Sequence, residues 1–194
     1  MIQLPELYSK HLKKQFSYPQ YLMLLILLNL LQNLKTVRLE ELARRFPSPI
    51  KLKSRVMKLP RFLSRQEFNL KKLWLPIIKS WMQEEFKQGE VIEIAIDRSQ
   101  WQGINLLRVS LMYANRGIPL YFRLLPKKGN SNLAAQKTVL EPVFELLKGF
   151  TIVVLGDREF CSVDLGKWLS EKEQVYFSLR LKKNEYVELE AVSY

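Results

Sequence analysis

The spacing of the hydrophobic positions changes once along the chain, from a helical period to a strand period. In the first ninety residues, apolar side chains recur every three or four positions, as they do on the buried face of an amphipathic helix. We expect Pro60 to end one helix, and Pro76 to interrupt another or split it into a pair. The pattern predicts helices over residues 21–34, 36–46, 50–59 and 66–88.

From residue 90 onward, apolar and polar residues alternate in short runs that are typical of strands. The first three strands are joined by short turns and should form an antiparallel meander. The last two follow helical crossovers and should run parallel to a neighbour. This β-β-β-α-β-α-β order predicts an α/β fold with an RNase H-like mixed sheet. The predicted strands are 91–97, 105–113, 117–126, 151–157 and 174–182, and the predicted helices are 131–149 and 162–173.

Charge separates the two halves of the chain. The whole sequence holds 31 Lys and Arg against 19 Asp and Glu, a formal net charge of +12. Residues 1–90 carry 17 basic and 7 acidic residues, a net of +10, whereas residues 91–194 carry 14 and 12, a net of +2. Such an excess favours an anionic partner, with nucleic acid first. We therefore expect a helical, basic, DNA-binding region at 1–90 and a catalytic domain at 91–194.

Within the basic half, the sequence "PSP" at 47–49 separates two short helices and suggests a helix-turn-helix-like element. Its second helix carries several cations and is the candidate nucleic-acid contact. The alternative is that these cations form only a solvated helix face. The candidate residues are Lys51, Lys53, Arg55 and Lys58.

Cys161 is the only cysteine and His11 the only histidine. A single cysteine cannot form an intrachain disulfide, which favours a reducing, cytoplasmic location. The same counts exclude a zinc site built from several His or Cys ligands and argue against a Ser-His-Asp triad. The apolar run at 21–34 is shorter than the roughly 20 residues of a spanning helix, so we expect a core helix and no membrane partner.

Two predicted strands end in the same way, with an apolar run followed by Asp and then Arg: "AIDR" at 95–98 and "LGDR" at 155–158. If these strands are neighbours, Asp97 and Asp157 lie side by side near the carboxyl edge of the sheet. Two carboxylates in contact repel each other and lose hydration. A divalent cation such as Mg²⁺ removes this cost, because it prefers oxygen ligands. The pair is therefore the candidate metal site.

Arg98 and Arg158 would neutralise these acids or contact phosphate. In the competing interpretation the same residues serve structure alone: Asp157 caps the following helix, and Asp97 forms a surface ion pair with Arg98.

Four stretches carry a family resemblance: "AIDRSQW", "NLLRVSLMYANRGIPLYFRLLPKKGNSN", "VVLGDREFCSVDLGKWL" and "SLRLKKNEY". They resemble bacterial insertion-sequence transposases of the DDE type, in the group whose third acid lies in a Tyr-Arg-Glu-Lys signature. The resemblance covers most of residues 36–194. It implies an RNase H-like catalytic domain, cutting and joining of double-stranded DNA at element ends with Mg²⁺ or Mn²⁺ in a two-metal mechanism, and a DNA-binding N-terminal region. Asp97 matches the first catalytic acid and Asp157 the second.

The third acid of that family is not found before Tyr194, so the resemblance implies a chain cut short ahead of the signature. With two of three acids we expect weak metal binding and little DNA cleavage by this chain alone. A homodimer or a second polypeptide that supplies the missing part stays open. One alternative function is a non-catalytic DNA-binding module that competes with full-length transposase. A stand-alone nuclease would need a third acid from Glu93, Glu185, Glu188 or Glu190.

Overall fold

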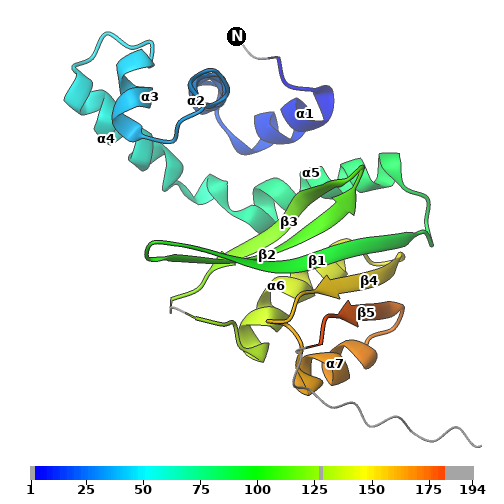
Figure 1. Cartoon of the computed structure of the whole chain (residues 1–194). Helices are drawn as coiled ribbons and strands as arrows, with labels where there is room; N and C mark the ends of the chain where they lie inside the picture. The colour runs from blue at the N-terminus through cyan, green and yellow to red at the C-terminus, as the bar shows by residue number, and fades with distance from the viewer. Residues whose placement is uncertain (1–2, 127–128, 182–194) are drawn as a thin grey trace, which may run out of the picture. The chain divides into compact units, whose positions relative to one another are not determined.

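The structure is a computed structural model that describes residues 3–126 and 129–181. The chain divides into two compact units, Met1–Glu85 and Phe86–Tyr194 (Figure 1). The first unit is helical. Its elements are α1 (Glu6–Gln15), α2 (Tyr18–Leu34), α3 (Leu39–Arg45), α4 (Leu52–Leu63), the 3-10 helix η1 (Gln66–Phe68) and α5 (Leu70–Glu85).

The core of the first unit forms around α2, which is apolar on most of its surface. This helix begins where the Gln20 side chain accepts a hydrogen bond from the Ser17 N–H at 2.7 Å, as in a capping box. Three rings pack beside it, with centroids 5.1 to 6.2 Å apart: Phe16, Phe62 and Phe68. The sequence pattern thus correctly predicted a helical first half with a buried apolar helix.

Two prolines do not break their helices, contrary to the expectation. α4 continues through Pro60, and α5 continues through Pro76. An internal proline costs about 3 kcal/mol. That cost is offset where neighbouring side chains are buried, as Leu59 and Phe62 are in α4. The bounds of α4 also differ from the predicted 50–59, because the helix begins at Leu52 and ends at Leu63.

No single helix in the described residues is long and apolar enough to cross a bilayer. One bent pair, Tyr18–Leu34 with Leu39–Arg45, meets the criterion on length and composition only, and its helices meet at 110°.

Over residues 86–126 and 129–181, the second unit is a five-stranded mixed sheet with two helices. Its strand order is β3-β2-β1-β4-β5; β1 is antiparallel to β2 and parallel to β4. β2 and β3 are antiparallel, and β4 and β5 are parallel. The predicted meander and the parallel last strands are therefore confirmed. The elements are β1 (Val91–Trp101), β2 (Ile104–Tyr113), β3 (Arg116–Leu124), α6 (Leu133–Leu146), β4 (Thr151–Gly156), α7 (Val163–Ser170) and β5 (Val175–Leu179).

Both helices cover the same face of this sheet (Figure 1). α6 packs on β2 and β3, α7 packs on β5, and the Phe144 and Trp168 rings stack with centroids 5.7 Å apart. On β1, the residues facing these helices are buried, namely Ile92, Ile94 and Ile96. Because side chains alternate along a strand, Asp97 points to the opposite face.

β1 does not end at Asp97 as expected but continues to Trp101. Its pairing with β4 stops at Ile96↔Gly156, whereas its antiparallel pairing with β2 continues to Trp101↔Ile104. The second partner keeps the backbone extended beyond the point where the first one turns away. Asp97 therefore lies inside a strand, just past the end of the parallel pairing.

Gly156 occupies a position with no room for a side chain. A Cβ there would lie 2.7 Å from Leu179 Cδ2 and 3.0 Å from Phe160 Cβ. We predict that Gly156→Ala destabilises the second unit by about 1–3 kcal/mol through overpacking. Denaturant unfolding followed by circular dichroism measures this change. Gly103→Ala is the matched control and should change stability by less than about 0.5 kcal/mol, because its Cβ would meet no atom within 4 Å. Equal effects of the two changes would contradict the assignment.

Candidate functional site

The two aspartates that the sequence singled out follow directly after paired residues. Ile96 and Gly156 are the last partners of the parallel β1–β4 ladder; Asp97 is the next residue of β1, and Asp157 is the first residue after β4. Both acids act electrostatically on the same guanidinium, that of Arg98. The topology thus brings together the two residues that lie 60 positions apart in the sequence.

Asp97 pairs with an arginine on the neighbouring strand. Arg108 Nη2 donates to Asp97 Oδ2 at 2.7 Å, and the two residues are also register partners on β1 and β2. Both side chains are almost half exposed, so the pair contributes at most about 1 kcal/mol. The expected alternative, a surface pair of Asp97 with Arg98, is not the arrangement found. Within residues 3–126 and 129–181, Asp97 Oδ1 accepts no hydrogen bond.

Asp157 is exposed and shapes the turn after β4. Its Oδ1 accepts the Glu159 N–H at 2.9 Å, and its carbonyl oxygen accepts the Phe160 N–H at 3.1 Å. It does not cap the next helix, because the cap of α7 is Ser162, whose Oγ accepts the Leu165 N–H at 3.1 Å. In the described part of the chain, Asp157 Oδ2 has no hydrogen-bond partner.

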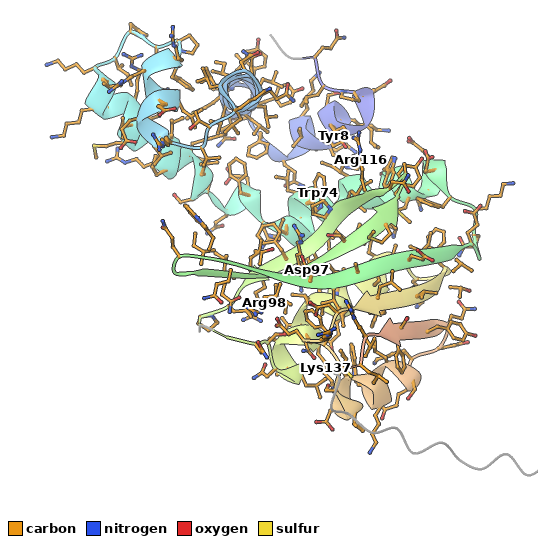
Figure 2. The ribbon with its side chains drawn as sticks, in the orientation of Figure 1. Tyr8, Trp74, Asp97, Arg98, Arg116 and Lys137 are labelled. Carbon is orange, nitrogen blue, oxygen red and sulfur yellow. The ribbon has the colours of Figure 1, made fainter. Side chains whose placement is uncertain are left out.

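A buried ion pair lies beside the two aspartates, and sequence reasoning did not find it. Arg98 Nε lies 2.6 and 2.7 Å from the two carboxylate oxygens of Glu159. The two side chains are only 15% and 13% exposed. The pKa of the Arg98 guanidinium is raised, mainly by its hydrogen bond to Glu159; desolvation opposes the rise, and the charges of Glu159, Asp157 and Asp97 add to it. Figure 2 shows Asp97 and Arg98 in the middle of β1.

Further hydrogen bonds connect this ion pair to the loop before α6. Glu159 Oε1 accepts from the Ser131 N–H at 3.2 Å and from its hydroxyl at 3.3 Å. Arg98 Nη1 donates to Asn105 Oδ1 at 3.2 Å, and Asn105 Nδ2 donates to the Gly129 carbonyl at 3.0 Å. Arg98 and Glu159 thus hold β1, the start of β2, the loop before α6 and the turn containing Asp157 in one arrangement.

Asp97 and Asp157 offer two carboxylates as candidate ligands of a divalent cation. Mg²⁺ usually takes one or two carboxylates and completes its shell with water and phosphate oxygens. Among the described residues, no group of three or more His, Cys, Asp or Glu could hold a metal. Glu159 is engaged by Arg98, and Glu93 lies four residues before Asp97, about 13 Å away along β1. Glu185, Glu188 and Glu190 lie outside the described residues.

The candidate nucleic-acid contacts differ in their surroundings. Lys51, Lys53 and Arg158 are exposed. Arg55 serves the fold, since its Nη1 donates to the carbonyl oxygens of Arg44 and Phe46, at 3.4 and 3.0 Å, and so fastens the end of α3. Lys58 lies over a ring, that of Phe46, with Nζ 5.6 Å from its centroid. DNA binding by these residues, and by Arg98, stays a prediction.

Comparison with known proteins adds little to this geometry. No protein-family model matches the sequence, and the search of curated proteins found no match. Among solved structures, a piggyBac transposase in a synaptic complex with hairpin DNA matches at 13% sequence identity and a TM-score of 0.43. The match covers 92% of this chain and 47% of that chain, so this chain spans about half the length of that transposase. A similarity of this size does not establish a shared function.

The Arg98–Glu159 pair gives a test of the local architecture. We predict that Glu159→Gln destabilises the second unit by about 1–3 kcal/mol, because it leaves a largely buried guanidinium without its counter-charge. Denaturant unfolding measures the change. The matched control is Glu41→Gln, which removes the exposed Arg38–Glu41 pair and should cost about 0.5 kcal/mol or less. If both variants unfold at the same denaturant concentration, the buried pair does not hold the site together.

Proposed function

We propose that this chain is the RNase H-like, metal-dependent core of a DDE-type DNA transposase, in which Asp97 and Asp157 are two of the metal-binding acids. The observation that supports this proposal most strongly is the register of β1 and β4, since both acids follow the last residue pair of the parallel ladder. The strand order, with its antiparallel meander and two parallel strands, supports the RNase H-like part of this proposal. The sequence resemblance to insertion-sequence transposases identifies the same two residues.

The side chains near the end of the β1–β4 ladder would have different roles. Asp97 and Asp157 would hold Mg²⁺ or Mn²⁺, which activates an attacking hydroxyl and stabilises the leaving oxygen of a phosphodiester when bound. Arg108 now neutralises Asp97, and its exposed side chain can turn towards a phosphate when a cation takes over that charge. Arg98 and Glu159 orient the turn that carries Asp157 and do not themselves bind metal.

A second candidate function is DNA binding without catalysis. The observation in its favour is the net charge of +10 in residues 1–90, together with the exposed Lys51 and Lys53 at the start of α4. This function needs neither Asp97 nor Asp157. The two candidates therefore respond differently to changes at these aspartates.

Metal binding separates the two candidates. We predict that the full chain binds Mn²⁺, detected as a loss of the free-ion signal in electron paramagnetic resonance, and that Asp97→Asn and Asp157→Asn each lower the affinity about tenfold or more. The physical reason is that each change removes one charged ligand of a shared ion. Glu93→Gln is the matched control, because it removes a carboxylate from the same strand at the far end.

DNA binding, measured on the same variants without metal, should stay within about twofold of the parent, because either change removes only one charge from a strongly basic chain. Mn²⁺ affinity that is equal in Glu93→Gln, Asp97→Asn and Asp157→Asn would contradict the proposed catalytic core. Intact DNA binding would then support the binding module alone.

A further inference from the structure

The hairpin formed by β1 and β2, together with the segment that follows it, has an extreme charge composition. Residues 98–140 hold seven Lys or Arg and no Asp or Glu, although the second half of the chain is nearly balanced. This run begins immediately after Asp97. These charges do not form one surface, because Arg98 is largely buried against Glu159 and Lys137 lies on α6. The positive run as a whole still attracts a polyanion by charge, independently of any metal.

A tryptophan lies at the tip of this hairpin. Trp101 pairs with Ile104 across the two-residue loop, in which Gln102 has a positive φ of 52°. The Trp101 side chain is 68% exposed, whereas Trp168 is only 7% exposed. Exposing an indole in water is unfavourable, so a solvent-facing tryptophan at a hairpin tip points to a contact made on binding. Figure 1 shows the tip as the free end of the long β1–β2 hairpin.

The indole shares a sheet face with the candidate metal ligand. Trp101 lies four residues beyond Asp97 on the same strand, so both side chains fall on the face opposite α6 and α7, about 13 Å apart along the strand. The register adds the exposed Ile104 to this face, and Leu124 beside it through its partner Leu106. Arg108 lies directly opposite Asp97 on β2, level with the candidate metal site along the hairpin.

We propose that the β1–β2 hairpin tip is a stacking platform for an unpaired base of the DNA strand that the Asp97–Asp157 site would cut. This inference rests on the proposed function, because it states that the DNA bound at the Asp97–Asp157 site has an unpaired base. Arg108, which lies level with Asp97, contacts a phosphate at the cut position. Trp101 stacks on the base, and Ile104 packs against its edge.

The composition of the tip favours a nucleic acid over a protein partner. Base–aromatic stacking needs a flat exposed ring within a positively charged groove. Gln102, in the two-residue loop next to the indole, is an uncharged amide that can hydrogen-bond to a base. An unpaired base is required because, inside an intact duplex, both faces of each base are covered by its neighbours.

The experiment compares two DNA probes with the full chain, in EDTA so that the metal site plays no part. One probe is a short blunt duplex, and the other is the same duplex with a single-stranded extension. We expect Trp101→Ala to weaken binding of the extended probe by about 5- to 150-fold, the equivalent of one stacked base. It should leave blunt-duplex binding within about twofold. Trp101→Phe should retain most of the affinity.

Tyr176→Ala is the matched control, because Tyr176 is an aromatic residue of similar exposure, 62%, on the edge strand β5 of the same unit. It should change neither affinity. A second readout is acrylamide quenching of tryptophan fluorescence: the extended probe should protect the parent protein from quenching and should give no such protection in Trp101→Phe.

Unchanged affinity of Trp101→Ala for the extended probe would overturn the inference, as would an equal loss on both probes. Either result leaves the proposed function standing if Asp97→Asn and Asp157→Asn still lower Mn²⁺ affinity. A third result is that Asp97→Asn and Asp157→Asn do not lower Mn²⁺ affinity while Trp101→Ala still weakens binding of the extended probe. That result would leave a single-strand-binding hairpin without the catalytic site.

Discussion

The parallel ladder of β1 and β4 runs from Val91↔Thr151 to Ile96↔Gly156, and the candidate site exists because of where it stops. In both segments the next residue along the chain is an aspartate, so one hydrogen-bonding register determines that two acids 60 positions apart become neighbours. A shift of one residue in this register would turn one side chain to the opposite face. Gly156 helps to fix it, since the close approach of Phe160 and Leu179 leaves no room for a Cβ.

Charge at the end of this ladder is arranged in two layers. The inner layer is the Arg98–Glu159 pair, largely buried and hydrogen-bonded to Ser131 and Asn105. The outer layer is half exposed and contains Asp97 with Arg108, next to the exposed Asp157. The inner pair has its charges satisfied within the protein, so it suits a positioning task. The outer acids keep oxygen atoms that accept no hydrogen bond in the described residues, so they suit a cation or a phosphate-bound metal.

Much of this arrangement could be predicted from the sequence. The change of period near residue 90, the meander and the two parallel strands follow from local patterns, and the repeated Asp-Arg ends identified Asp97 and Asp157. The length of β1 could not be predicted by the same reasoning, because it depends on β2 as a second partner. The pattern also misjudged Pro60 and Pro76, where buried neighbours outweigh the lost hydrogen bond. The role of Glu159 could not be predicted, since it depends on a contact with Arg98, 61 residues away. The pairing of Arg108 with Asp97 could have been predicted, because both residues are five positions from the Gln102–Gly103 turn of the hairpin.

The central claim is that Asp97 and Asp157 share one cation. A crystal structure of the full chain grown with Mn²⁺, with anomalous diffraction data, tests this claim most directly. The account predicts an anomalous peak at about 2.0–2.3 Å from a carboxylate oxygen of each aspartate. A peak at only one of them, or side chains that point to opposite faces of the sheet, would contradict it.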